Sequence, residues 1–414
     1  MAKNNKSVDQ LEAEQLERLV KILGAGGIGN GQGSADHGGK EQGGADQGGK
    51  GKGGAEYKLE SLSDLAKLPV LRKDELLKSQ RDDPPFGLLK PTKIANIYQS
   101  PGPVYEPRLP GTDPWRFGKF LRAIGIKRSD IVQNTFAYHF TPAGAMFESA
   151  ARAVEATVFP AGPGQSRQQA EVAQAIRTTV YAGTPDFLNI ILTKADEEGF
   201  DLSHIKHAAV SAGPLFPQLR QSYLERGIIC RQCYGTADVG LIAYETEDCI
   251  DGMFVDDDVI VEILSPGTGN PVPAGEIGEV VVTVLNETHP LVRFSVGDLS
   301  AFMSETGDTQ KRIVGWRGRA DQAAKVKGMF IRPEQVSAIV ERHPEIDRAR
   351  VEVSFDGSTE WIDVKLESKL KDAEKFEEIV RETLKLKARI TIVDDGGIPR
   401  DGILVSDLRE NVPG

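Results

Sequence analysis

Between residues 131 and 245 the chain alternates short apolar runs with helical runs, and this alternation constrains the fold more than any other feature. Residues 131–138 predict a strand, 143–156 a helix and 157–160 a second strand. The pattern continues with a helix over 166–177, a strand over 179–182 and a helix over 185–198. Strands that alternate with helices in this way pair in parallel and are covered on both faces. The sequence therefore predicts an α/β fold with a mostly parallel sheet flanked by helices.

The loops that follow the predicted strands are where such a sheet binds ligands. Parallel strands place their carboxyl ends along one edge, so the loops 138–144, 161–165, 183–185, 212–214 and 234–235 are expected to gather there. We therefore expect the ligand-binding residues to lie in these loops.

The flanking parts of the chain predict smaller units. Residues 255–302 contain strands without helices, which indicates a β-rich subdomain. After residue 318 the pattern becomes a compact α+β module, which predicts a small C-terminal domain. We expect three parts: a helix and flexible glycine-rich segment over 1–58, a large domain over 59–317 and a small domain over 318–414. The α+β module is predicted to contain a helix at 333–342, strands at 349–355 and 362–366, a helix at 373–386 and a strand at 389–393.

The charge of the chain excludes two classes of partner. Its net charge of −11 and its pI near 5.3 oppose binding to nucleic acid or to an anionic membrane surface. No apolar run approaches the length of a transmembrane helix, and the N-terminus leads into a charged helix over 8–23. We expect a cytoplasmic protein, and a homodimer remains open.

The cysteines raise the question of a zinc site. Cys230 and Cys233, with Cys249 and His207, offer four ligands of the types that zinc binds. However, Cys230 and Cys233 fall in an apolar run that predicts a buried strand, where alternation sends them to opposite faces. The sequence therefore favours structural thiols over a metal site.

Three motifs follow one another in the second half of the chain. They are Tyr-Gly-Thr-Ala-Asp-Val-Gly at 234–240, Pro-Leu-Val-Arg-Phe-Ser-Val-Gly-Asp-Leu at 290–299, and Gly-Arg-Ala-Asp-Gln-Ala-Ala-Lys-Val-Lys-Gly at 318–328. In this order they resemble the nucleotide-binding half of the adenylate-forming (AMP-dependent synthetase/ligase) enzymes. Together with the opening segment 59–76, they resemble the phenylacetate-coenzyme A ligase family in particular. The resemblance covers residues 59–409.

The resemblance implies a role for five side chains. Tyr234 matches the aromatic platform for adenine, Asp298 the acid that grips the ribose hydroxyls, and Asp238 the carboxylate that holds Mg²⁺ beside the phosphates. Asp238 stands where the family usually has glutamate. Arg319 matches the arginine that reaches ribose or phosphate. Asp321 matches the hinge residue about which the small domain rotates, so the resemblance implies a small mobile C-terminal domain. The plainer alternative is that Asp298 and Asp321 cap turns beside glycines. The further nucleotide-binding candidates are Ala212, Gly213, Pro214, Gly235 and Thr236.

The expected phosphate loop departs from the family. The family has a loop rich in Ser, Thr and Gly that wraps the ATP phosphates. Residues 97–107 lie at this place and lack the hydroxyl pair, Pro101 and Pro103 have no N–H to donate, and Glu106 is expected to repel a triphosphate.

A second departure concerns a lysine. The family's lysine, which bridges the substrate carboxylate and the α-phosphate, is replaced here by Ile403. Arg400 and Lys325 are the nearest cations that the sequence offers. One preorganised charged donor is often worth ~3–4 kcal/mol in such a step, so the sequence predicts impaired adenylation.

The acid-binding side rests on three residues. Tyr138, His139 and Phe140 correspond to a family segment beside the aryl-acid pocket, where aromatic rings would sandwich a planar substrate. Ordinary core aromatics at the end of a strand are the alternative.

The resemblance thus implies an acid-thiol ligase. It would convert a carboxylic acid, expected to be an aryl acid, to its coenzyme A thioester through an acyl-adenylate, with ATP or AMP, Mg²⁺ and coenzyme A as its small molecules. The alternative is a weakened homologue that binds a nucleotide or acyl-CoA as a sensor or partner subunit.

Overall fold

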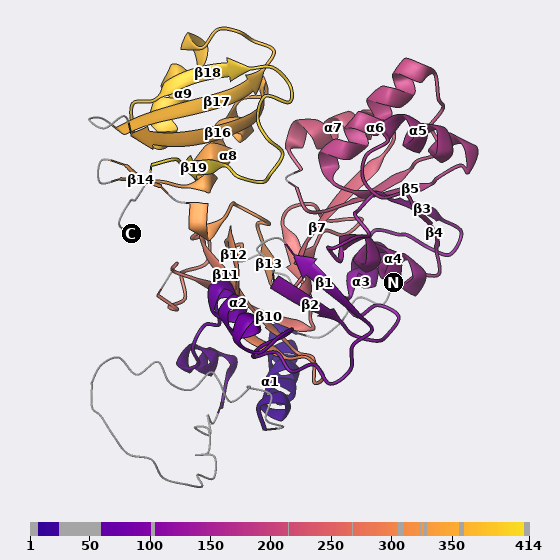
Figure 1. Ribbon diagram of the computed structural model, residues 1–414, viewed down its shortest axis with the longest axis vertical. Coiled ribbons are helices and arrows are strands. Elements are labelled where there is room, and N and C mark those ends of the chain that lie inside the picture. Colours follow the sequence, from indigo (N-terminus) through magenta and orange to yellow (C-terminus); the bar gives the residue numbers. More distant parts are fainter. Residues whose placement is uncertain are drawn as a thin grey trace.

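The computed structural model describes most of the chain and confirms the α/β fold (Figure 1). The glycine-rich tract, residues 101–103 of the expected phosphate loop, and Pro214 lie outside the described residues. Among the described residues, no helix combines the length and the apolar character needed to cross a membrane. The described residues are 7–24, 59–100, 104–213, 215–266, 268–304, 310–322, 324–326, 329–355 and 360–409, with the backbone alone at 321, 325, 329, 330, 355 and 360.

The large domain is built on an eight-stranded sheet in the order β13-β9-β8-β7-β6-β5-β3-β4. The strands from β4 to β7 run parallel, as the sequence predicts, and β8, β9 and β13 add an antiparallel edge. The strands are β3 (Ile131–Asn134), β4 (Thr157–Pro160), β5 (Val180–Gly183), β6 (His207–Val210), β7 (Ile229–Thr236), β8 (Gly240–Tyr244), β9 (Met253–Val255) and β13 (Arg312–Ile313).

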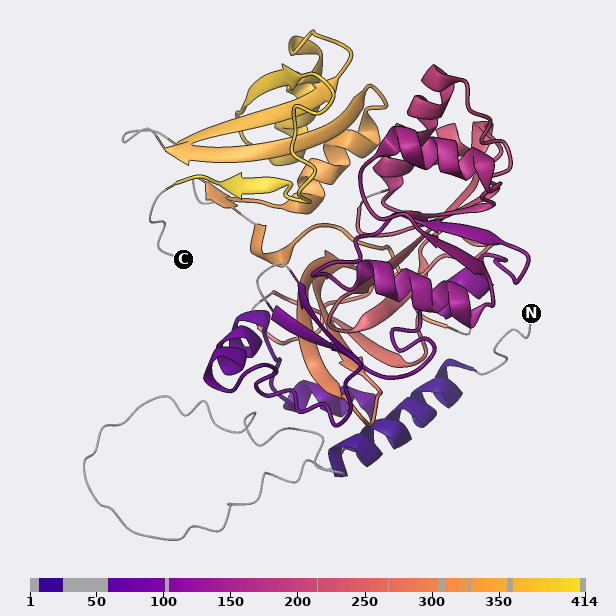
Figure 2. The ribbon, with the colours of Figure 1, turned by 45° about the vertical axis from the view of Figure 1, so that its right-hand side comes forward.

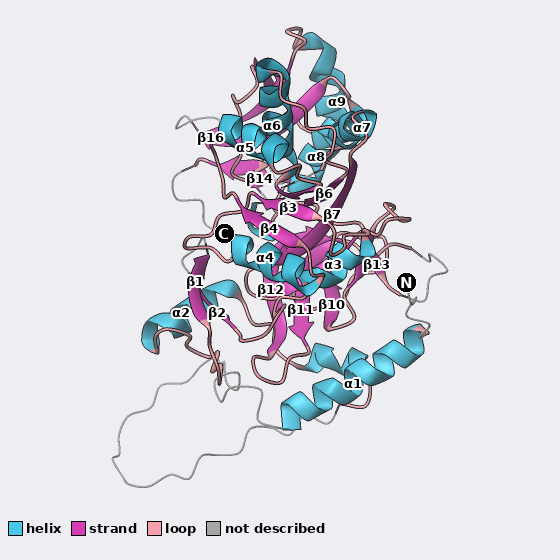
Figure 3. Ribbon diagram, turned by 90° about the vertical axis from the view of Figure 1, so that its right-hand side faces the viewer, coloured by secondary structure: helices cyan, strands magenta, loops and turns pink. Residues whose placement is uncertain are grey.

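Helices cover both faces of this sheet (Figure 3). Helices α3 (Phe117–Ala123) and α4 (Ala143–Ala153) pack on one face. Helices α5 (Ser166–Ala175), α6 (Pro185–Glu198) and α7 (Pro217–Glu225) pack on the other. Cys233 belongs to the first core and Cys230 to the second, so the two thiols point to opposite faces as the strand alternation predicts.

A second, antiparallel sheet forms the predicted β-rich subdomain. Its strands are β10 (Val259–Leu264), β11 (Gly278–Val284) and β12 (Leu291–Ser300). Around it lie α1 (Val8–Gly24), the short 3-10 helix η1 (Leu62–Lys67), α2 (Lys73–Asp82) and a hairpin of β1 (Asn96–Ser100) and β2 (Val104–Arg108). Helix α2 lies against both β12 and β2, so this N-terminal segment is part of the body of the large domain.

The C-terminal module has a core of its own (Figure 2). Its four-stranded sheet has the order β18-β17-β16-β19, and Phe216 of the large domain packs against its core. The expected boundaries at 58/59 and 317/318 remain proposals. The elements are η2 (Ala320–Gln322), β14 (Ala324–Val326), β15 (Met329–Ile331), α8 (Pro333–Arg342), β16 (Ile346–Phe355), β17 (Glu360–Ser368), α9 (Glu374–Leu384), β18 (Arg389–Val393) and β19 (Val405–Asp407).

The first predicted strand is shorter than expected. Residues 131–138 favour a strand by their apolar content, but β3 ends at Asn134. The Asn134 amide donates to the Gly144 carbonyl at 2.8 Å, and its oxygen accepts from the Phe136 N–H at 3.2 Å. These bonds turn the chain away from the sheet, so the aromatic residues that follow form a loop.

Candidate functional site

The centre of the candidate site is the carboxylate of Asp298, near the end of β12. The Tyr234 hydroxyl donates to its Oδ2 at 2.8 Å, and Trp316 Nε1 donates to its Oδ1 at 3.2 Å. Arg319 Nη1 lies 3.4 Å from the same Oδ1. Asp298 and Tyr234 are each 7% exposed. Two of the expected site residues, Tyr234 and Arg319, therefore contact the carboxylate of the third, Asp298.

The backbone explains why these side chains meet. The segment that follows β13 runs back along β12, with the Leu299 N–H bonded to the Gly318 carbonyl at 2.8 Å and a bridge between Asp298 and Arg319. Gly297 has a φ of +76°, and a Cβ at this position would lie 2.9 Å from Arg319 Nη2. Glycine therefore lets the arginine lie across the strand.

Burial sets the electrostatics of the carboxylate. It raises the pKa of Asp298, while the charge of Arg319 and the hydrogen bonds from Tyr234 and Trp316 lower it. Burial and the neighbouring Asp298 also raise the pKa of Tyr234, so this phenol keeps its proton and stays a donor. Trp316 was missed by the sequence analysis. The sequence signal for Trp316 is its place two residues before the third motif, but the family pattern assigns no role to this indole.

The expected metal ligand, Asp238, is paired with a cation that the sequence analysis did not identify. Lys73 Nζ lies 3.3 Å from Asp238 Oδ2, and the Asp238 side chain is 3% exposed. The other oxygen, Oδ1, is buried and receives no hydrogen bond from an amide, a hydroxyl or a cation among the described residues. The sequence does carry a signal for this contact. A lysine in the first turn of a helix is unfavourable beside the positive end of the helix dipole, so Lys73 at the start of α2 indicates an anionic partner.

Glu106 lies beside Asp238 and corrects one expectation. It is 3% exposed and accepts a hydrogen bond from the Ser100 hydroxyl at 2.7 Å. Burial and the nearby Asp238 raise its pKa well above the usual range of a carboxyl. Because this favours the neutral acid, the repulsion of a triphosphate that we expected from Glu106 is reduced.

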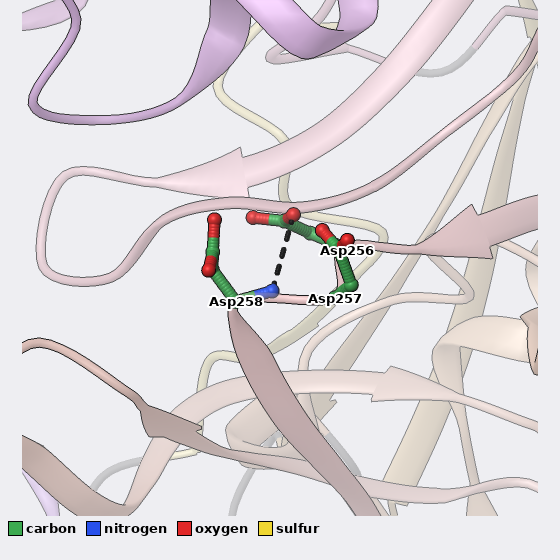
Figure 4. A group of neighbouring side chains, drawn as sticks. All are labelled: Asp256, Asp257 and Asp258. Atoms are coloured by element: carbon green, nitrogen blue, oxygen red, sulfur yellow. Dashed lines mark hydrogen bonds between the residues drawn. The ribbon is translucent and has the colours of Figure 1, made fainter. Parts of the chain in front are cut away.

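A second group of carboxylates, residues 256–258, lies next to β10 (Figure 4). Lys119 Nζ contacts all three, at 2.6 Å from Asp256 Oδ1 and 2.6 Å from Asp258 Oδ2. Arg116 and Arg18 pair with the same group. A lysine thus occupies the centre of these aspartates, and the group is an ion-pair network that ties α1 and α3 to the β-subdomain.

A cavity of about 1030 Å³ lies between the C-terminal module and helices α6 and α7. Trp316 lines it, which places the cavity next to the Asp298 site. Ala212, Gly213 and Ile403 line it as well. Ile403 therefore faces the same space as two of the expected nucleotide-binding residues.

The loop of Ile403 is held from two sides. The Gln322 side chain donates to the Gly402 carbonyl at 3.3 Å and accepts from the Leu404 N–H at 2.9 Å. Arg400, one of the two cations considered for this region, pairs with Asp186 of α6. The other, Lys325, has no described side chain.

The remaining nucleotide-binding candidates support the turn around β7. Thr236 Oγ1 accepts from the Val239 N–H at 3.4 Å. A Cβ at Gly235 would lie 2.6 Å from the Gly240 carbonyl oxygen, so only glycine fits here. Asp321 belongs to η2, and its side chain lies outside the described part.

The expected acid pocket is spread out. Tyr138 is half-buried and its hydroxyl accepts from the Asn134 amide at 2.7 Å, whereas His139 and Phe140 are exposed, Phe140 to 77%. Phe136, in the same segment, stacks on Phe147 in the core with ring centroids 4.5 Å apart. Phe136 thus fits the plainer alternative of a core aromatic, while the pocket residues remain a prediction.

Comparison with known proteins agrees with this architecture. The family model described as "AMP-binding enzyme" matches residues 116–284. The phenylacetate-coenzyme A ligase of Aromatoleum evansii is 28% identical over 378 residues, covering 87% of this chain and 82% of the relative. The ligase of the same name from Escherichia coli (strain K12) is 26% identical over 438 residues, covering 98% and 97%.

Solved structures share the fold. A 2-hydroxyisobutyryl-CoA ligase in the postadenylation state, in complex with 2-HIB-AMP, aligns with a TM-score of 0.72 at 22% identity, covering 84% of this chain and 82% of that one. The same ligase with 2-HIB-AMP and CoA in the thioesterification state aligns with a TM-score of 0.59 at 22% identity, covering 85% and 82%.

Proposed function

Because the chain belongs to the phenylacetate-coenzyme A ligase family of the adenylate-forming enzymes, we propose that it joins a carboxylic acid to coenzyme A through an acyl-adenylate. The names of the curated relatives favour an aryl acid as the substrate. Coenzyme A and the acid are then its partners, and a cytoplasmic location remains part of the proposal.

The observation that carries this proposal is the buried carboxylate of Asp298 with its three donors. The donors come from two separate segments, β7 and the strand-like run after β13, and they fix both oxygens of the carboxylate. A carboxylate held in this way can accept hydrogen bonds from the two hydroxyls of a ribose. Arg319 then lies one residue beyond Gly318, where its guanidinium can reach the ribose or its phosphate.

Asp238 offers the kind of ligand atom that Mg²⁺ binds. Asp238 Oδ1 is a buried carboxylate oxygen that receives no hydrogen bond from an amide, a hydroxyl or a cation of the described residues, and hard oxygen ligands are the ones that Mg²⁺ prefers. When bound, Mg²⁺ would neutralise phosphate charge during adenylation. The structure also places Lys73 on the second oxygen, so a metal at Asp238 has to share this carboxylate with an ammonium group.

Adenylation is the weaker half of the proposed reaction. Ile403 brings no charge to the cavity that it lines, and Arg400 is engaged by Asp186. These two features also favour the second candidate function, a homologue that binds a nucleotide or acyl-CoA as a sensor or partner subunit. Both candidates require the Asp298 site.

Calorimetry with AMP, ATP and coenzyme A tests the proposal. We expect AMP to bind, and Asp298→Ala to abolish the binding because the ribose hydroxyls lose their acceptor. An unchanged affinity for AMP in Asp298→Ala would show that the motif match is accidental. We also expect AMP to bind more tightly than ATP, and ATP binding about tenfold tighter than AMP in the presence of Mg²⁺ would contradict this.

A further inference from the structure

Lys73 joins the N-terminal segment to the candidate site. Its ammonium lies 3.3 Å from Asp238 Oδ2, and its side chain is 31% exposed while that of Asp238 is 3% exposed. The lysine thus reaches a buried anion from a position that a solute can approach. An ion pair of this kind, with one partner accessible, can exchange its anion for another.

The backbone at Lys73 is fixed relative to the strand that carries Asp298. Leu71 forms a bridge with Phe294 of β12, and its carbonyl accepts from the Ser295 N–H at 2.9 Å. Arg72 pairs with Glu279 of β11 at 2.8 Å. Helix α2 begins immediately after these contacts, so the first residue of the helix is held beside the candidate nucleotide site.

The charge of Lys73 acts on more than one carboxyl. It opposes the effect of burial on the pKa of Asp298 and of Glu106, in addition to its direct contact with Asp238. Its ammonium therefore contacts the carboxylate expected to hold metal and acts through its charge on the carboxylate expected to hold ribose. A phosphate attached to a ribose on Asp298 would meet the same positive charge.

The position of this lysine in its helix is unfavourable by itself. Lys73 is the first residue of α2, where the partial positive charge of the helix end opposes a cation. The contact with Asp238 compensates for this cost. A phosphate would compensate for it better, because it carries more charge and meets both the ammonium and the helix end.

We propose that Lys73 binds the phosphate of a nucleotide whose ribose lies on Asp298. This assignment rests on the proposed function. The ammonium exchanges between Asp238 and the phosphate, and in doing so it couples two binding events. While Lys73 pairs with Asp238, it disfavours a divalent cation on the same carboxylate, and a bound phosphate draws it away.

The first experiment isolates the phosphate. Affinities for AMP and adenosine are measured by calorimetry with EDTA present, in the unmodified protein, in Lys73→Met and in the control Lys78→Met. Lys78 is an exposed lysine in the same helix. We expect the ratio of the AMP affinity to the adenosine affinity to fall about tenfold in Lys73→Met, because a charge-assisted contact is lost. Lys78→Met should keep the ratio, and Lys73→Arg should retain part of it.

The outcomes distinguish a failure of the role of Lys73 from a failure of the proposed function. An unchanged ratio in a Lys73→Met protein that binds adenosine normally would overturn the role of Lys73 alone. If neither AMP nor adenosine binds the unmodified protein, the proposed function fails and this assignment fails with it. Thermal unfolding of each variant shows whether a loss of both affinities comes from loss of the fold, and Lys73→Gln then replaces Lys73→Met in the same comparison.

The second experiment measures the metal directly. Mn²⁺ binding is followed by electron paramagnetic resonance without any nucleotide. We expect Lys73→Met to bind Mn²⁺ about tenfold more tightly than the unmodified protein, since the competing charge at Asp238 is gone. Lys73→Met/Asp238→Asn should lose this gain. Equal Mn²⁺ affinity in Lys73→Met and the unmodified protein would overturn the exchange of the ammonium between Asp238 and phosphate.

Discussion

The hydroxyl of Tyr234 donates a hydrogen bond to Asp298 Oδ2 across 2.8 Å, and this contact joins the eight-stranded sheet to the antiparallel subdomain. Tyr234 ends the buried part of β7, whereas Asp298 lies near the end of β12. The phenol therefore does more than offer a ring to a ligand. It fixes the carboxylate that the proposed ribose contact needs.

Tyr234→Phe tests this relationship. The variant removes the donor from a buried carboxylate oxygen, and we expect about 1–3 kcal/mol of destabilisation together with weaker adenosine binding. Tyr223 provides a matched control, because its buried hydroxyl donates to the Pro185 carbonyl on the other side of the sheet. Tyr223→Phe should lower stability and leave adenosine binding unchanged. Normal adenosine affinity in Tyr234→Phe would show that Asp298 does not depend on this donor.

The raised pKa of Asp298 predicts the pH dependence of ligand binding. A protonated carboxyl cannot accept from both ribose hydroxyls, so affinity is present above the pKa of Asp298 and is lost as the pH falls through it. Because burial raises this pKa, the loss should begin at a higher pH than for an ordinary aspartate with its value of 3.8. Adenosine is the suitable ligand, since it has no phosphate to titrate. Constant adenosine affinity down to pH 4 would contradict the assignment.

His289 predicts a pH dependence of stability. Burial lowers its pKa from 6.5 to about 4, against the attraction of Asp238. Between these values the unfolded chain binds a proton that the folded protein excludes, so stability is full above pH 6.5 and falls as the pH drops toward 4. At ~1.4 kcal/mol per pKa unit, the loss is at most about 3.5 kcal/mol.

Urea denaturation of His289→Gln checks this expectation. The variant carries no titrating imidazole, so the loss of unfolding free energy between pH 6.5 and 4 should shrink relative to the unmodified protein. His204 is a control, because it is a second partly buried histidine and its Nε2 contacts the Ala173 carbonyl at 2.8 Å. The same pH profile in the unmodified protein and in His289→Gln would show that other groups cause the acid loss.

The regular elements could be predicted because they are encoded locally. Helix α8 and strand β18 have the bounds that the periodicity predicts, and Pro333 at the first helical position marks the start of α8. The strand alternation also placed Cys230 and Cys233 on opposite faces correctly. These predictions need only the spacing of apolar residues and a few start signals.

The contacts of the site could not be predicted in the same way. Lys73 and Asp238 are 165 positions apart, and their contact depends on how α2 packs against β12. From the sequence, Glu106 is expected to carry a charge that repels a triphosphate, because the sequence does not show that this side chain is buried beside another carboxyl. The family pattern supplied Tyr234, Asp298 and Arg319. The contact of Trp316 with Asp298 and that of Lys73 with Asp238 come from tertiary packing.

The ion pair between Arg400 and Asp186 allows a test of the proposed hinge of the C-terminal module. It joins the module to α6, and its side chains are 37% and 30% exposed, so we expect it to contribute less than about 1 kcal/mol. Asp186→Asn should therefore loosen the module slightly and speed proteolytic cleavage within residues 315–325. Arg400→Gln should have the same effect, and the double variant should add little. An absence of cuts in this segment in every variant and ligand state would remove the support for a hinge there.

The two half-reactions should fail unequally. Adenylation needs charge neutralisation around the transferring phosphoryl group, and Ile403 brings none to the cavity that it lines with Ala212 and Gly213. Thioester formation only needs a preformed acyl-adenylate and coenzyme A to be held in line. We therefore expect the protein to convert a synthetic aryl-adenylate and coenzyme A to the thioester faster than it exchanges pyrophosphate into ATP.

Ile403→Lys tests the cause of this difference. Gln322 holds the backbone of the loop on both sides of residue 403, so a lysine there starts from a fixed position facing the cavity. We expect it to raise the exchange by no more than about tenfold, because the loop of Pro101 and Pro103 still lacks donors. Ile403→Met, which adds a long side chain without charge at the same position, should give no gain. Rapid acid-dependent exchange by the unmodified protein would contradict impaired adenylation, because it would show that the cations already present, Lys73 among them, neutralise the phosphates. No turnover in either assay, with measurable binding of AMP or acyl-CoA, would favour the sensor or partner subunit.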